Sequence, residues 1–259
     1  MNIVYTPNSQ LCNKIWSIAG IIAHSIVYKE KVIIVGLKRY ADLFPNLRIR
    51  NNVCVPPVFI DKILSYVYFY FLLKIKYKTT YNKNKKSHSL CFINGWDFRQ
   101  DYDNLDIVYQ EIIYLFSPTV NIKNRCEMKF NKERERTDKI IGIHLRRGDY
   151  KTYKEGIYYY DDTVMYSYMK QISILFSAKK IKFFIASNES VNMSSFIEFN
   201  CFTSDINSTM DDLFSLSLCD YILGPPSTFS MWASFYGKKP LRILDYKDEI
   251  LTIDSFEVI

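Results

Sequence analysis

Short apolar segments of strand length alternate along most of the chain with longer segments in which apolar residues recur at helical spacing. The stretch from 11 to 28 is of the second kind, because Leu11, Ile15 and Ile22 fall on one face of a helix. Strands are predicted at 2–5, 31–35, 91–93, 139–145, 182–186 and 221–223, and helices at 11–28, 105–116, 159–176, 211–218 and 227–236. Strands that alternate with helices predict an α/β fold with parallel sheets.

A strongly charged segment separates the two halves of this pattern. Residues 124–139 carry many charges of both signs and few apolar side chains. We expect this segment to be an exposed linker. The chain would then form two α/β domains, residues 1–130 and residues 131–259, each large enough to bury a core of its own.

Composition excludes some classes of protein and leaves others open. With 48% apolar residues among 259, the chain is not of the disordered kind. The six cysteines are scattered without a Cys-x-x-Cys pair, so no zinc site is indicated. No signal-peptide pattern opens the chain, and we expect reduced thiols in a cytoplasmic protein. The net charge of +7 suits an anionic substrate, a nucleic acid or an anionic membrane surface, and does not choose among them.

One apolar segment raises the question of a membrane. Residues 63–73 are apolar on every side but too few to span a bilayer. Six lysines follow between 74 and 86. An aromatic segment beside a basic run is typical of an interfacial anchor, which would hold the protein at the cytoplasmic membrane face. The alternative is a buried helix followed by a solvated loop.

The first candidate site lies at 140–150, which reads Ile-Ile-Gly-Ile-His-Leu-Arg-Arg-Gly-Asp-Tyr. An apolar strand pattern runs directly into Arg146 and Arg147. Open α/β sheets bind ligands beyond the carboxyl ends of their strands, and the guanidinium fork matches the oxygens of a diphosphate. We therefore expect an anion here, the alternative being a solvated strand end.

The second candidate site opens the helix predicted at 227–236. Ser227 and Thr228 follow a Gly-Pro-Pro turn. The unbonded N–H groups and the positive dipole end of a helix start favour an anion. Ser227 and Thr228 are also ordinary N-cap residue types, which is the alternative.

Together the two segments resemble glycosyltransferase family 11, the bacterial α-1,2-fucosyltransferases. The run His-x-Arg-Arg-Gly-Asp-Tyr at 144–150 resembles their donor-binding motif, whose core the α-1,6- and protein O-fucosyltransferases share. Residues 212–233, an aspartate-bearing helix, a strand and then Ser-Thr-Phe-Ser, resemble their second conserved region. A weaker likeness lies at 10–16, where Asn13 stands at the family's asparagine.

The resemblance implies a GT-B-like fold, with two Rossmann-type domains facing each other across a cleft. Residues 1–130 would form the acceptor side, and residues 131–259 would bind the GDP-sugar. The implied reaction moves L-fucose from GDP-β-L-fucose to a glycan hydroxyl with inversion, in an α-1,2 linkage. The acceptor would be an oligosaccharide or a lipid-linked glycan of a surface polysaccharide such as lipopolysaccharide O-antigen, and no cofactor or metal ion would be required.

The resemblance also implies roles for individual residues. Arg146 would contact the β-phosphate of the donor, supported by Arg147. His144 and Asp212 would contact guanine, whose N1–H and N2–H a carboxylate can accept together. Further donor contacts would come from Asn13, Ser227, Thr228 and Phe229.

The acceptor base has two candidates in the loop after the arginines. Asp149 and Glu155 both follow the strand end, and either carboxylate could take a proton from an acceptor hydroxyl. Asp149 could instead hold the arginines in place.

Departures from the family pattern keep other functions open. Ser-Asn-Glu at 187–189 and Pro226 differ from the family's usual residues, which permits a transferase that uses another nucleotide sugar. A basic nucleic-acid-binding protein is a remote alternative that rests on the lysines at 74–86 alone. Asp101 and Asp103 match the Asp-x-Asp of metal-dependent transferases, but they lie well beyond the strand at 91–93, and we expect no metal site there.

Overall fold

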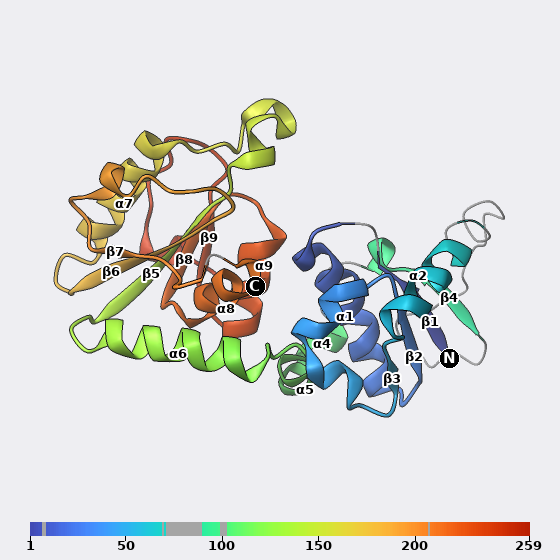
Figure 1. Cartoon of the computed structure of the whole chain (residues 1–259). Helices are drawn as coiled ribbons and strands as arrows, with labels where there is room; N and C mark the ends of the chain where they lie inside the picture. Colours follow the sequence, from blue (N-terminus) through green and yellow to red (C-terminus); the bar gives the residue numbers. More distant parts are fainter. Residues whose placement is uncertain (7–8, 69, 71–89, 99–102, 207) are drawn as a thin grey trace. The chain divides into compact units, whose positions relative to one another are not determined.

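The structure is a computed structural model that describes residues 1–6, 9–68, 70, 90–98, 103–206 and 208–259 (Figure 1). The chain forms two compact units, Met1–Thr119 and Val120–Ile259. Each unit contains one parallel sheet with helices between its strands, so the expected α/β class is confirmed.

The first unit is built on a four-stranded sheet with the order β3-β2-β1-β4. Its strands are β1 (Asn2–Tyr5), β2 (Val32–Val35), β3 (Val53–Cys54) and β4 (Cys91–Asn94). Its helices are α1 (Leu11–Val27), α2 (Val58–Val67), α4 (Asp103–Ile107) and α5 (Tyr109–Leu115). The strands and the first helix predicted here are confirmed, whereas the helix predicted at 105–116 is divided at Val108, which has φ −116° and ψ 28°.

The second unit is built on a five-stranded sheet with the order β7-β6-β5-β8-β9. Its strands are β5 (Lys139–Leu145), β6 (Ile181–Ser187), β7 (Cys201–Phe202), β8 (Tyr221–Gly224) and β9 (Leu241–Ile243). Its helices are α6 (Val120–Arg134), α7 (Asp162–Leu175), α8 (Thr209–Leu218) and α9 (Thr228–Gly237). All strand pairs are parallel.

Strand β5 is buried on both faces of the second sheet. Ile141, Ile143 and Leu145 pack in one core with Met165 and Met169 of α7. On the opposite face, a side chain at Gly142 would lie 2.7 Å from Leu216 and 2.9 Å from Cys219, so α8 approaches the bare backbone there. Helix α7 therefore covers one face, and α8 covers the other (Figure 1).

The prediction of an exposed linker at 124–139 is wrong for most of that segment. Residues 120–134 form α6, which packs against α8. Cys126 and Phe130 are buried, and the ring centroid of Phe130 lies 5.4 Å from those of Phe184 and Phe202. Two apolar residues four positions apart are enough to bury one helix face, and the expected domain boundary at 130/131 falls inside this helix.

The charges of α6 predicted an exposed segment, but four of them have partners in distant parts of the second unit. Arg125 pairs with Asp211 at 2.6 Å, and Arg134 pairs with Asp220 at 2.9 Å. Lys129 pairs with Asp205 at 2.8 Å, and Glu133 pairs with Lys182 at 2.5 Å. A segment of mixed charges is exposed to solvent on all sides only when its charges have no such partners in other parts of the fold.

The apolar segment at 63–73 falls partly outside the described residues, and the lysines at 74–86 fall wholly outside them. In its described part, Ile63, Tyr66 and Val67 are exposed, which does not agree with a buried helix. Within the described ranges, no helix is long and apolar enough to cross a bilayer.

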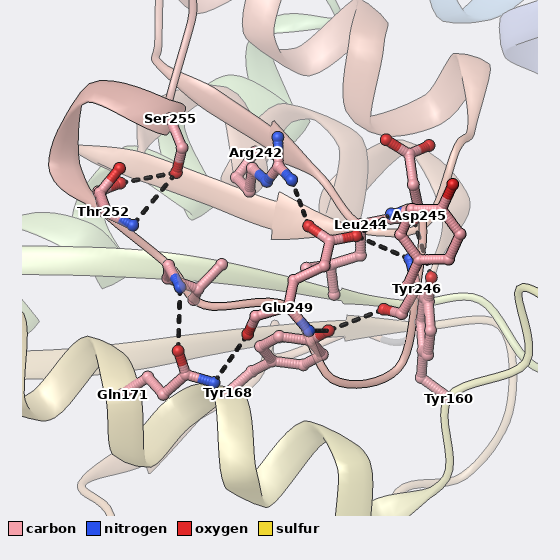
Figure 2. Close-up of polar contacts among 11 residues, drawn as sticks. Tyr160, Tyr168, Gln171, Arg242, Leu244, Asp245, Tyr246, Glu249, Thr252 and Ser255 are labelled. Carbon is pink, nitrogen blue, oxygen red and sulfur yellow. Dashed lines mark hydrogen bonds and ion pairs between the residues drawn. The ribbon is translucent and has the colours of Figure 1, made fainter.

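The C-terminal segment is tied to α7 by a polar network around Glu249 (Figure 2). The Glu249 carboxylate, only 9% exposed, accepts hydrogen bonds from Arg242 and from the backbone N–H of Tyr246. The Tyr168 hydroxyl donates to the Tyr246 carbonyl at 2.7 Å and accepts from the Glu249 N–H at 3.1 Å. The Gln171 side chain donates to the Glu249 carbonyl at 3.0 Å and accepts from the Leu251 N–H at 2.9 Å.

Glu249→Ala should lower the free energy of unfolding of the second unit by about 2 to 4 kcal/mol. The substitution leaves Arg242 and two backbone N–H groups of the network without their buried acceptor. Urea denaturation followed by circular dichroism measures the change. Glu257→Ala, at an exposed glutamate of the same segment, should change stability by less than about 0.5 kcal/mol, and equal losses in both variants would remove the network's role.

Candidate active site

In the second unit, the order of the strands changes direction between β5 and β8, and we call the carboxyl ends of these two strands the β5–β8 edge. From β5 the chain continues to β6 on one side, while β8 lies on the other side. Such a switch in direction opens a crevice at the carboxyl ends of the two strands, where α/β proteins bind ligands. Both candidate motifs end at this edge, one after β5 and one after β8.

His144 lies at the end of β5 on the face covered by α8 and α9. Its ring centroid is 4.9 Å from that of Phe229, and the residue is 3% exposed. Gly224 of β8 stands opposite, where a Cβ would come within 2.9 Å of the His144 Cβ, so glycine is required for this packing. Burial first, and then the charge of Arg146, lower the pKa of His144 to about 3. The ring is therefore neutral at physiological pH, and its Nδ1 has no hydrogen-bond partner among the described residues.

Arg146 follows on the same edge. Its side chain is 13% exposed and pairs with Asp149 at 2.9 Å. Its guanidinium carbon lies 5.6 Å from the ring centroid of Tyr150. The carboxylate and the ring both contact the guanidinium. A positioning role for Asp149 and a role as the acceptor base both stay predictions.

Arg147 lies on the α7 side of the strand end. Its guanidinium pairs with Asp162 at the start of α7, and its backbone N–H donates to Asn188 Oδ1 at 2.8 Å. Burial raises the pKa of Asp162, but hydrogen bonds from Ser195 and Arg147 outweigh burial, and the net pKa is lowered. Arg147 thus anchors the loop to α7 and β6.

The second motif is joined to the first by Tyr150. Ser227 is the N-cap of α9, and its Oγ accepts the Phe229 N–H at 3.2 Å, so the N-cap interpretation is confirmed. Thr228 opens the helix. The Tyr150 hydroxyl donates to the carbonyl of Pro226, the residue before the cap. Arg146 and the N-terminus of α9 are therefore connected through a single side chain.

Asp212 lies in the first turn of α8 and reaches the end of β6. Its carboxylate accepts from Ser204 Oγ at 2.5 Å and from the backbone N–H of Ser187. The pKa of Asp212 is raised to about 6, because burial and, to a smaller extent, the charge of the neighbouring Asp211 outweigh these two hydrogen bonds, which lower it. Ser187 pairs with Leu145 across the sheet, so Asp212 belongs to the same edge as His144.

The predicted site residues of the second unit fall into three groups. His144, Arg146, Asp212, Ser227, Thr228 and Phe229 belong to the elements that meet at the β5–β8 edge. Arg147 and Asp149 support that edge, and Glu155 is exposed in the loop that leaves it. Tyr150, which joins both motifs, was not singled out in the sequence, although its place directly after Arg-Arg-Gly-Asp was a usable signal.

Asn13 belongs to the first unit, in the first turn of α1, where it is half-buried. Its neighbour Lys14 is buried, and Lys14 Nζ donates to the Gly36 carbonyl at 2.7 Å and to Thr6 Oγ1 at 3.2 Å. Burial first, and then the charge of Lys38, lower the pKa of Lys14 to about 8, while Asp61 raises it. The start of α1 is thus fastened to the carboxyl ends of β1 and β2.

Metal ligands do not gather in this site. Across the described ranges, no group of three or more His, Cys, Asp or Glu side chains is placed to hold a metal ion. Asp101 of the Asp-x-Asp match lies outside the described residues.

Two parallel sheets, each flanked by helices, are the fold of GT-B fucosyltransferase structures. A FUT1 variant of Arabidopsis thaliana solved with GDP is similar with a TM-score of 0.63 and 15% identity, over 99% of this chain and 73% of that one. The fucosyltransferase NodZ from Bradyrhizobium has a TM-score of 0.62 and 13% identity, over 94% and 96%. POFUT1 in complex with GDP has a TM-score of 0.53 and 12% identity, over 92% and 94%.

The family follows from the sequence itself. The profile of glycosyl transferase family 11 matches residues 1–249, and the chain belongs to that family. No curated protein sequence matches it. The resemblance seen in the motifs at 144–150 and 212–233 is thereby confirmed, and it extends over residues 1–249.

His144 should remain neutral throughout the range from pH 5 to pH 8, because its pKa is held at about 3. Its ring nitrogen chemical shifts in ¹⁵N-edited NMR should therefore not change over that range, with His144→Gln used for the assignment. An unfolded histidine takes up its proton near pH 6.5. The free energy of unfolding should consequently fall as the pH drops from about 6.5 toward 3. A His144 titration near pH 6.5 would contradict its burial.

Proposed function

We propose that this enzyme transfers L-fucose from GDP-β-L-fucose to a hydroxyl of a glycan, with inversion and in an α-1,2 linkage. The observation that carries the proposal is the juxtaposition of Arg146, the N-terminus of α9, neutral His144 and the Asp212 carboxylate at one strand edge. A cation and a helix start suit a diphosphate, and a carboxylate suits the N–H pair of guanine. Related folds have been solved with GDP and with GDP-fucose, which supports the same donor here.

The leaving diphosphate gains charge as the glycosidic bond breaks. In the proposed mechanism, Arg146 and the N–H groups of α9 stabilise that charge, and the sugar passes through an oxocarbenium-like transition state. Asp149 and Tyr150 hold Arg146 in place before the donor arrives, so little reorganisation is needed. We propose that these groups make a metal ion unnecessary.

The proton of the acceptor hydroxyl needs a base. Asp149 is engaged by Arg146, whereas Glu155 is exposed on the loop that leaves the same strand end. We therefore favour Glu155 as the base and Asp149 as a positioning residue. The acceptor would be an oligosaccharide or a lipid-linked glycan of a surface polysaccharide, modified in the cytoplasm.

A second candidate is transfer from another nucleotide sugar. The residues that depart from the family pattern have structural partners here, since Asn188 accepts from the Arg147 N–H and the Pro226 carbonyl accepts from Tyr150. Calorimetric titration with GDP-fucose, GDP-mannose, UDP-galactose and ADP-glucose separates the candidates. Heat with GDP-fucose alone supports the first, and binding of a UDP- or ADP-sugar in its place would reject it.

Arg146→Ala should nearly abolish transfer and weaken GDP binding while the fold survives. The loss of one charge-assisted bond costs about 1.5 to 3 kcal/mol in binding, and removal of a transition-state donor costs about 10² to 10³ in kcat. Steady-state kinetics and circular dichroism measure both effects. Arg136→Ala, at an exposed arginine before β5, is the matched control. A fully active Arg146→Ala enzyme would reject the assignment.

Asp212→Asn should weaken GDP binding about 10- to 100-fold and change UDP binding little, because an amide cannot accept both N–H groups of guanine in the same way. In the unsubstituted protein, GDP affinity should also fall as the pH is lowered through about 6, where Asp212 takes up a proton. The variant should lack that pH dependence. Calorimetry from pH 5 to pH 8 measures it, with Asp205→Asn at an exposed carboxylate as the control. Equal weakening of GDP and UDP would exclude guanine recognition by Asp212.

A further inference from the structure

The loop between β5 and α7 carries a continuous row of tyrosine rings. The ring centroids of Tyr150 and Tyr153 are 5.2 Å apart, and those of Tyr153 and Tyr158 are 6.4 Å apart, with 31° between the planes in both pairs. Lys154 Nζ lies 5.8 Å from the Tyr153 centroid and 5.4 Å from the Tyr158 centroid. Tyr153 is 48% exposed, so the row is not part of the core of the second unit.

The backbone of this loop is held in an unusual conformation. Lys154, Glu155 and Gly156 are three successive residues with positive φ, of 46°, 60° and 75°. Residues with a side chain adopt this region at a cost in free energy, and such strain is concentrated at functional sites. Its effect here is to reverse the chain, so that Tyr158 returns beside Tyr153.

The row begins at the reacting end of the proposed donor site. Its first ring, Tyr150, lies under the guanidinium of Arg146. The candidate nucleotide contacts, His144, Asp212 and Phe229, belong to the face covered by α8 and α9, whereas this loop leads to α7 on the other face. In Figure 1 the loop, in yellow-green, projects beyond the end of the sheet. The loop that carries the rings therefore starts at the proposed leaving-group position and leads to α7, away from the elements that carry the candidate nucleotide contacts.

We propose that Tyr153, Tyr158 and Lys154 form a subsite for the sugar rings of the acceptor, an inference that rests on the proposed function. The face of an aromatic ring is negative, and the C–H groups of a pyranose face are weakly positive, so the two pack together. The Lys154 ammonium can donate hydrogen bonds to the sugar hydroxyls around that contact. An acceptor hydroxyl must come within about 3 to 3.5 Å of the donor sugar. The further sugar rings of the acceptor therefore need a binding surface that starts beside Arg146.

The test compares three variants with the unsubstituted enzyme on an array of neutral oligosaccharides that end in galactose, glucose, N-acetylglucosamine, mannose or rhamnose, in the presence of GDP. Tyr153→Ala with Tyr158→Ala should lose at least tenfold in array binding. Tyr153→Phe with Tyr158→Phe keeps the ring faces and should retain binding. Tyr246→Ala, at a 65% exposed tyrosine of the same unit, is the matched control. With an acceptor identified on the array, the double alanine variant should raise its KM at least tenfold and leave kcat at saturation unchanged.

Donor titration separates this subsite from the proposed function. The double alanine variant should bind GDP-fucose as tightly as the unsubstituted enzyme does. If the unsubstituted enzyme itself does not bind GDP-fucose, the proposed function is rejected. The array result then decides separately whether the subsite exists. Retained array binding by the double alanine variant, loss in the phenylalanine variant, or no glycan binding by the unsubstituted enzyme would each overturn the subsite. Loss of binding to phosphatidylglycerol vesicles, with array binding intact, would show that the tyrosines contact lipid instead.

Discussion

Burial of β5 on both faces is the constraint on which the second unit depends. Ile141, Ile143 and Leu145 face α7, and Gly142 lets α8 approach the backbone on the other side. A strand covered in this way is apolar along most of its length, so its polar and charged side chains gather at its carboxyl end. The same burial places His144 against Phe229 and removes its charge. The chemistry of the edge thus follows from the packing of the strand that leads to it.

The two arginines after β5 show how neighbouring residues of one type acquire different roles. Side chains alternate across a strand, and this alternation continues into the first residues after it. Arg147 pairs with Asp162 on the α7 side, while Arg146 is held by Asp149 and Tyr150 near the start of α9. One guanidinium anchors the loop. The other, Arg146, lies at the edge where we propose that the donor binds, and that edge also carries a buried carboxylate, Asp212, with a raised pKa.

The most exposed part of this edge is also the part with the most strained backbone. Three successive residues with positive φ fold the loop 153–156 back on itself. Such a loop needs support, and Lys151 pairs with Glu189 while Arg147 bonds Asn188, both in the loop after β6. The loops that follow adjacent strands therefore stabilise one another, and the position of each depends on the register of the sheet.

The sequence alone determined the class of fold, the family and the two motifs of the candidate site. Apolar periodicity is a local property, so the strands at 139–145 and 221–223 and the helix at 11–28 could be predicted from it. Helix α6 could not, because its charges are neutralised by Asp211 and Asp220, residues more than 80 positions away. Only the tertiary structure decided that Tyr150 joins the two motifs, and that burial lowers the pKa of His144 to about 3 while it raises the pKa of Asp212 to about 6. Burial and electrostatic environment depend on which segments pack together, and no stretch of sequence contains that information by itself.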